Sequence, residues 1–131
     1  MSLSPPPDPR GLPPGYRFKP DWEITPRDTA ERLRSSGTRV LLLDCRRREE
    51  WDTARIDGAV LIPMDQLERR ADELEDDEGE RSREIVVYCH HGVRSLRVAA
   101  TLRALGFPNV KSMAGGIDAW SVGIDPGVPR Y

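Results

Sequence analysis

The sequence is poor in cysteine and in aromatic residues, and it has no long apolar run. Among its 131 residues there are two cysteines, two phenylalanines, three tyrosines and three tryptophans. Two cysteines cannot form the disulfide framework of a small secreted domain. No apolar run approaches the roughly 20 residues that a membrane-spanning helix needs. No basic stretch followed by an apolar segment opens the chain, so we expect a cytoplasmic protein with reduced thiols.

The sequence also lacks an excess of charge of either sign. Lys and Arg total 20 against 22 Asp and Glu, which gives a net charge of −2 and a pI near 5.7. A dedicated nucleic-acid binder carries a basic excess on one face, so we expect neither a nucleic-acid nor a membrane partner. Hydrophobic residues make up 37% of the chain, which suits one compact globular domain of this length.

Prolines are present but unevenly distributed. Seven of the twelve lie in the first twenty residues. Proline lacks an amide donor and has a fixed φ, so this arm cannot form a helix or a central strand. We expect residues 1–21 to be an extended tail or linker, with Tyr16 and Phe18 held against the domain, and residues 22–131 to form that domain.

Short apolar runs alternate with helical patterns along the rest of the chain. Strands are predicted at residues 40–43, 59–62, 85–88 and 109–112, and helices at residues 26–36, 94–105 and 116–120. Thr25 and Pro26 are typical of a helix start, and Gly37 of its end. This alternation predicts an α/β domain with a mainly parallel sheet.

Acidic residues are concentrated in residues 65–84, which hold ten acids against four arginines. Leu67, Ala71 and Leu74 recur at helical spacing in the first half, which predicts a helix followed by a loop. Such a charge run is typical of a solvated face, and a negative docking patch is the alternative.

One cysteine stands where a parallel sheet binds its ligands. Cys89 follows the predicted strand at residues 85–88 and precedes a helix. Ligands bind at the carboxyl ends of the strands in open parallel sheets. The positive end of the helix dipole and its unpaired amides lower the pKa of a thiol. The pattern predicts a reactive thiolate, with an inert buried cysteine as the alternative.

The residues that follow Cys89 are suited to an anion-binding loop. The loop is expected to comprise His90, His91, Gly92, Val93, Arg94 and Ser95. Gly92 permits a tight turn with inward-pointing amides, Arg94 adds a cation, and Ser95 is placed to cap the helix. We expect no metal, because adjacent histidines should point apart and the spacing fits no zinc pattern. The two imidazole rings are instead expected to line the mouth of the pocket.

Six segments, in order, resemble a single-domain rhodanese. They are Ile24-Thr25-Pro26, Leu43-Asp44-Cys45-Arg46, Glu50-Trp51, Ile56-Asp57-Gly58-Ala59-Val60, the Cys89 loop, and Gly115-Gly116-Ile117-Asp118-Ala119-Trp120. The resemblance runs from about Trp22 to the end of the chain. It implies a rhodanese-like three-layer domain, with a central mainly parallel sheet of about five strands and helices on both faces. One departure is Ala54-Arg55, where the family commonly has Gly-His.

The resemblance implies a thiosulfate sulfurtransferase-like enzyme without a cofactor. The Cys89 thiolate would take the outer sulfur of a small donor such as thiosulfate, and a thiol or cyanide would remove it from the resulting persulfide. The loop amides would stabilise both anions, while Arg94 would hold the oxyanion end of the donor or orient the loop. The loop also resembles rhodanese segments fused to adenylyltransferases that activate sulfur carriers, so a sulfur-carrier protein is a candidate partner.

The length of the loop separates this chain from the phosphatases and arsenate reductases that are related to rhodaneses. Those proteins have five residues between the cysteine and the arginine, whereas four separate Cys89 from Arg94. The smaller cradle should fit a tetrahedral phosphate ester poorly, so we do not expect phosphatase activity.

The end of the strand at residues 40–43 supplies three supporting residues. Asp44 and Arg46 are expected to form a structural charge pair beneath the loop. Cys45 should lie near Cys89, either as a small buried hydrophobe or as a redox partner. Two other functions stay open: a non-catalytic rhodanese binding module, and a thiol-redox protein that uses Cys45 and Cys89.

Overall fold

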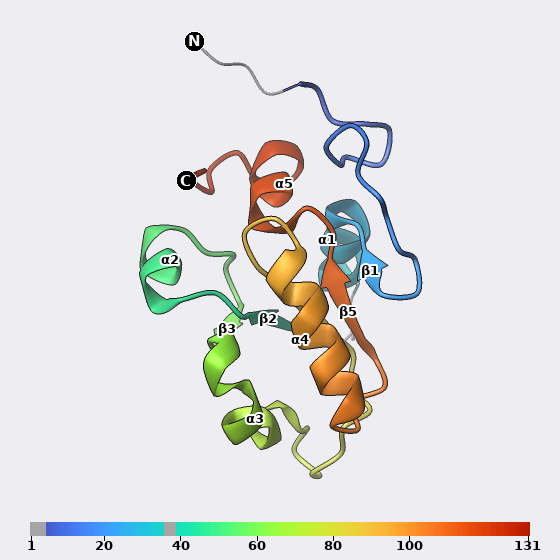
Figure 1. Ribbon diagram of the computed structural model, residues 1–131, viewed down its shortest axis with the longest axis vertical. Coiled ribbons are helices and arrows are strands. Elements are labelled where there is room, and N and C mark those ends of the chain that lie inside the picture. Colours follow the sequence, from blue (N-terminus) through green and yellow to red (C-terminus); the bar gives the residue numbers. More distant parts are fainter. Residues whose placement is uncertain (1–4, 36–38) are drawn as a thin grey trace.

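The protein is built on a five-stranded parallel sheet (Figure 1). The computed structural model describes residues 5–35 and 39–131. The strands are β1 (Glu23–Ile24), β2 (Leu41–Asp44), β3 (Val60–Leu61), β4 (Ile85–Tyr88) and β5 (Val110–Met113). Their order in the sheet is β1-β5-β4-β2-β3, and every neighbouring pair is parallel. This confirms the α/β class and the expected number and direction of the strands.

Helices cover both faces of the sheet, so the three-layer prediction is also confirmed. They are α1 (Pro26–Arg34), α2 (Arg48–Thr53), α3 (Leu67–Arg70), α4 (Val93–Ala104) and α5 (Gly116–Gly123), with 3₁₀ turns η1 (Met64–Gln66) and η2 (Ala71–Leu74). One buried cluster packs α3 and α4 on the sheet, and a second packs α1 and α5. Figure 1 shows α4 crossing in front of the strands. Within the described ranges, no helix is long and apolar enough to cross a membrane.

Two short elements were not predicted. β1 has only two residues, which is too few for an apolar pattern to appear in the sequence. The strand forms because β5 pairs with it, and Ser112 N donates to the Trp22 carbonyl at 2.8 Å. α2 has no buried residue, so it leaves no apolar stripe in the sequence. The predicted start of α1 is confirmed, since the Thr25 hydroxyl accepts from Asp28 N at 3.0 Å. The expected stop at Gly37 lies outside the described residues.

The acidic segment folds as predicted in outline. Its first half is helical but broken into η1, α3 and η2 in succession, with Leu67, Ala71 and Leu74 buried. Its second half is a loop in which the Asp76 carboxylate accepts from Glu80 N at 2.9 Å.

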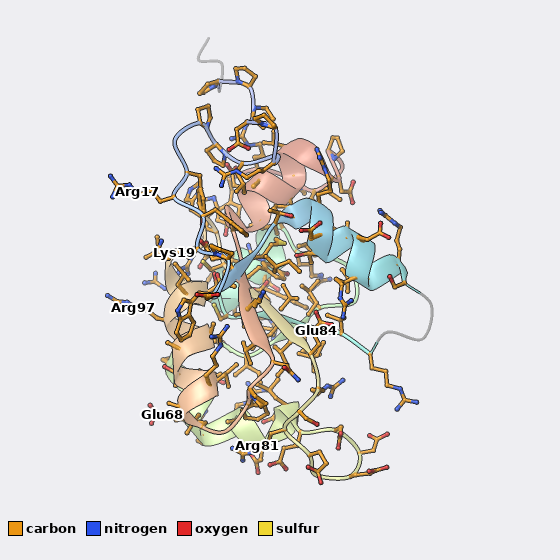
Figure 2. The ribbon with its side chains drawn as sticks, turned by 90° about the vertical axis from the view of Figure 1, so that its right-hand side faces the viewer. Arg17, Lys19, Glu68, Arg81, Glu84 and Arg97 are labelled. Carbon is orange, nitrogen blue, oxygen red and sulfur yellow. The ribbon has the colours of Figure 1, made fainter. Side chains whose placement is uncertain are left out.

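In the described part of the proline-rich arm, residues 5–21, the chain folds back against the domain and does not extend as a tail. The Asp8 carboxylate accepts from Leu12 N at 3.0 Å and forms a turn, and the Leu12 side chain is fully buried. The Tyr16 hydroxyl donates to Glu23 at 2.5 Å, as expected for a residue held against the domain. Arg17 and Lys19 project outward from the same arm (Figure 2).

Candidate active site

The Cys89 loop lies where the carboxyl ends of β2, β4 and β5 meet. It connects β4 to α4 beside the start of α5 (Figure 1). Two amides at that start donate to the loop: Ile117 N to the Cys89 carbonyl at 2.9 Å, and Asp118 N to the His90 carbonyl at 3.1 Å. The last helix of the chain therefore fixes the backbone of the loop.

Two glycines make this close packing feasible. Gly116 has a φ of 63°, and a Cβ there would lie 2.3 Å from the His90 carbonyl oxygen. Gly92 has a φ of 104°, and a Cβ there would lie 3.0 Å from the Tyr16 hydroxyl and 3.3 Å from Gly115 N. Side chains rarely adopt such φ values, so both the backbone conformation and the available space require glycine.

Three hydrogen-bonding groups converge on the Cys89 sulfur. Gly92 N donates to Sγ at 3.1 Å and Ser95 N at 3.3 Å, while the Ser95 hydroxyl lies 3.3 Å away. The inward-pointing amides follow the sequence prediction. The expected cap does not form, because Gly92 is the N-cap and Ser95 is the third residue of α4. Because Ser95 lies within the first turn of α4, its side chain faces the Cys89 thiol and not the unpaired amides at the start of the helix.

These contacts favour the anionic form of Cys89. The neighbouring Cys45 thiol has the largest effect, and it lowers the pKa of Cys89 together with the hydroxyl and amide of Ser95 and the amide of Gly92. Burial opposes them, yet the pKa falls to about 5. Cys89 is therefore a thiolate at neutral pH, which is the nucleophilic form.

Cys45 lies beside Cys89, as the order of the strands predicts. Asp44 pairs with Tyr88 in the parallel ladder, and Cys45 N extends that ladder by donating to the Tyr88 carbonyl at 3.1 Å. The adjacent Cys89 sulfur and burial raise the pKa of Cys45. The pair therefore consists of one thiol and one thiolate.

Arg94 points to α2 and not directly at the thiol. Its guanidinium forms two hydrogen bonds with the Glu50 carboxylate, at 2.6 and 2.9 Å. The Tyr131 hydroxyl also donates to Glu50, at 2.6 Å. Arg94 and then Tyr131 lower the pKa of Glu50 to about 2. Of the two roles expected for Arg94, this geometry favours orienting the loop over holding a donor.

Asp44 and Arg46 form the predicted charge pair. Both side chains are fully buried, and the Arg46 guanidinium contacts the Asp44 carboxylate at 2.6 Å. Arg46 also donates to the Ala54 carbonyl at 2.5 Å and to the Tyr131 hydroxyl at 2.7 Å. Through these contacts Arg46 ties together the end of β2, the end of α2 and residue 131.

The two histidines of the loop stack instead of pointing apart. The ring centroids of His90 and His91 are 3.9 Å apart, and Tyr131 stacks on the other side of His90 at 4.0 Å. The expectation failed because the loop is not a strand, so neighbouring side chains need not alternate. Val93 is 69% exposed on the outside of the loop. Within residues 5–35 and 39–131, no cluster of three or more acidic, His or Cys residues could hold a metal ion.

Sequence reasoning missed three contributors to the site. The buried Ser112 hydroxyl on β5 lies 2.7 Å from the Ser95 hydroxyl. Tyr16 packs against Gly92, and Tyr131 joins Arg46 to Glu50. Ser112 follows the exposed Lys111 in β5, so the alternation along this strand is the signal that places it on an inward face, whereas the tyrosines gave no local signal.

A cavity of about 510 Å³ opens beside the thiol pair. Its lining includes Cys45, Arg47, Pro63, Met64, Gln66 and Arg94. It is large enough for a small anion, and cationic side chains line part of it. The cavity therefore reaches Cys45 from the side of β2, and Cys89 lies behind its lining residues.

Comparison with known proteins gives a consistent result. The family model of the rhodanese-like domain matches residues 25–122. The probable adenylyltransferase/sulfurtransferase MoeZ of Mycobacterium tuberculosis is 36% identical over 82% of this chain and 26% of its own length. The adenylyltransferase and sulfurtransferase UBA4 of Candida albicans is 30% identical over 84% of this chain, again 26% of its own length. The chain thus spans about a quarter of these two relatives.

A solved structure of similar size agrees with the sequence comparisons. The human single-domain sulfurtransferase TSTD1 superposes with a TM-score of 0.65 and 28% identity, covering 75% of this chain and 93% of the human one. The segment of this chain that matches the family model includes the five α-helices, except for the last residue of α5. It also includes the whole Cys89 loop. The chain belongs to the family of rhodanese-like domains.

Proposed function

We propose that this protein is a sulfurtransferase that carries sulfur on Cys89. The observation that supports it most directly is the convergence of the Gly92 amide, the Ser95 amide and the Ser95 hydroxyl on the Cys89 sulfur. These donors stabilise a buried negative charge, and a nucleophilic thiolate needs that stabilisation. A binding module of the same fold would not need it, so the geometry favours catalysis over a scaffold.

The reaction proceeds in two displacements. The Cys89 thiolate attacks the outer sulfur of thiosulfate, the sulfur–sulfur bond breaks, and sulfite leaves with the electron pair. The new persulfide anion lies beside the same donors that held the thiolate. A thiol or cyanide then attacks the outer sulfur, and the Cys89 thiolate leaves unchanged. No electron is supplied from outside in either step.

The site sets the roles of its other residues. Arg94 and Glu50 hold the loop in position, and the buried pair of Asp44 and Arg46 supports the strand end beneath it. His90 and Tyr131 cover one side of the loop as a stack. In the described part of the chain, Arg47 is the cavity-lining arginine without a salt bridge, and its exposed side chain is available to a negatively charged donor.

The partners follow from the chemistry and from the relatives. The donor is a small sulfane-sulfur anion, and the acceptor is a thiol, on a small molecule or on a sulfur-carrier protein. Bacillus subtilis YrkF, described as a putative sulfur carrier protein, is 38% identical over 61% of this chain, which supports a carrier as partner. We expect the reaction in the cytoplasm, where cysteines stay reduced.

Intact-protein mass spectrometry tests the proposal. The chain is incubated with thiosulfate and sampled early, and one added sulfur should raise its mass by about 32 Da. Peptide mapping should place the sulfur on Cys89, and cyanide should remove it. Cys89→Ser should show no adduct, whereas the matched variant Cys45→Ser should still form it.

Two results would contradict the proposal. One is an adduct that maps to Cys45 and survives in Cys89→Ser. The other is an unmodified wild-type chain whose Cys89 is fully alkylatable but accepts sulfur neither from thiosulfate nor from a low-molecular-weight persulfide.

A further inference from the structure

The register of the strands places the two cysteines at a Cα spacing that suits a disulfide. They follow paired residues of adjacent parallel strands, since Asp44 is in register with Tyr88. Adjacent strands lie about 4.8 Å apart, within the range of about 4.4–6.8 Å that disulfide-linked Cα atoms require. Both side chains belong to the same buried cluster, so they lie on the same face of the sheet. Both cysteines are free.

The Cys89 and Cys45 sulfur atoms have different surroundings. This difference determines which of them reacts first with a sulfur donor. The Cys89 sulfur receives the Gly92 and Ser95 amides, whereas the Cys45 Sγ lies 3.4 Å from a hydrogen-bond acceptor, the Tyr88 carbonyl. Cys45 is thus held as a neutral thiol beside the anionic Cys89. Because only the anion attacks a sulfur donor, Cys89 is loaded first and Cys45 stays reduced next to it.

The addition of a sulfur atom to Cys89 changes the charge next to Cys45. In the persulfide, the negative charge resides on the added outer sulfur and no longer on the Cys89 Sγ. The anion that raises the pKa of Cys45 has then moved one sulfur away, which favours ionisation of Cys45. The inner sulfur becomes an electrophile at the position next to a second thiol.

We propose that Cys45 is an internal acceptor that reduces the Cys89 persulfide and releases hydrogen sulfide. This inference rests on the proposed sulfur transfer to Cys89. The Cys45 sulfur attacks Cys89 Sγ, a Cys45–Cys89 disulfide forms, and the bond between Cys89 Sγ and the outer sulfur breaks. The outer sulfur leaves as hydrosulfide and takes up the proton of Cys45.

The electrons balance without an added oxidant. The sulfane sulfur gains two electrons as it becomes sulfide, and the two cysteines lose two as they become a disulfide. A further turnover requires a dithiol reductant of the thioredoxin class to reopen the disulfide. Hydrosulfide can leave through the cavity that Cys45 lines, and the thiols of the reductant can reach the disulfide from the same side. The protein would then convert sulfane sulfur to sulfide when no external acceptor is present.

The test follows the persulfide after it has been formed. Reduced protein is loaded with inorganic polysulfide, excess reagent is removed, and mass and free sulfide are measured over time without acceptor. In the wild type, the species heavier by about 32 Da should convert to one lighter than the reduced protein by about 2 Da. One sulfide should appear for each disulfide. Cys45→Ala and Cys45→Ser should keep the persulfide at least about tenfold longer.

Loading with polysulfide separates this inference from the proposed function. If thiosulfate does not load the protein but the polysulfide-loaded wild type still forms the disulfide, Cys45 is an acceptor and only the sulfur donor is wrong. If the loaded wild type keeps its persulfide as long as Cys45→Ala and releases no sulfide, the role of Cys45 is overturned. In that case the transfer through Cys89 still stands.

Discussion

The Arg94 guanidinium and the Glu50 carboxylate form a two-pronged ion pair at the edge of the Cys89 loop, at 2.6 and 2.9 Å. The pair joins the first turn of α4 to α2, two elements 44 residues apart in the chain. Arg94 is therefore already neutralised by a carboxylate before any donor arrives. This contact favours a positioning role for the arginine of the loop.

A double-mutant cycle checks that assignment. Arg94→Ala and Glu50→Ala should each slow loading of Cys89 by thiosulfate, and the double variant should be no slower than the slower single one. The effects are not additive because both variants break one contact, with a coupling of about 1 kcal/mol. Additive losses would show that Arg94 contacts the donor independently of Glu50.

The reactivity of Cys89 should depend on pH through its own lowered pKa. The alkylation rate follows the thiolate fraction, so it should stay level near neutral pH and fall as the pH drops through about 5. Ser95→Ala removes one hydroxyl donor and should move this midpoint upward, by more than Arg94→Ala does. Iodoacetamide kinetics from pH 4 to 9 on the wild-type cysteine pair, with the alkylated residue located by peptide mapping, measure Cys89 with Cys45 in place. If the alkylation rate of Cys89 had its pH midpoint near the pKa of a free thiol, hydrogen bonds to the Cys89 sulfur would not be lowering its pKa.

Ser112 should act on the thiol through Ser95. Its hydroxyl is 2.7 Å from the Ser95 hydroxyl, which is in turn 3.3 Å from the Cys89 sulfur. When Ser112 donates to Ser95, the Ser95 proton is directed at the thiolate. Ser112→Ala should therefore raise the pKa of Cys89 in the wild type and have no effect on it in Ser95→Ala. An equal shift in both backgrounds would mean that Ser112 acts by packing alone.

The buried pair of Asp44 and Arg46 should matter for stability. Arg46→Ala leaves the Asp44 carboxylate buried without its partner, which costs about 3–5 kcal/mol of unfolding free energy. The double variant Asp44→Asn, Arg46→Met removes both charges and should lose less than Arg46→Ala alone. Urea denaturation monitored by tryptophan fluorescence measures both values. Equal losses in the two variants would show that volume, not the unpaired charge, sets the cost.

Local patterns carried most of the fold and part of the site. The apolar run at residues 85–88 and the glycine after Cys89 place a thiol between a strand and a helix, and the structure has β4 and α4 there. Thr25 and Pro26 mark the start of α1 because capping depends on neighbours in sequence. The elements that sequence reasoning missed, β1 and α2, are too short or too exposed to leave an apolar period.

The sequence by itself determined the α/β order, the position of Cys89 and the inward amides of its loop, because each depends on a few consecutive residues. Tertiary structure alone decided which side chains meet there. Glu50, Ser112 and Tyr131 reach the loop from α2, β5 and the last residue described. Such contacts depend on how side chains from separate elements are oriented and on the path of the chain between those elements, and no spacing along the sequence encodes either.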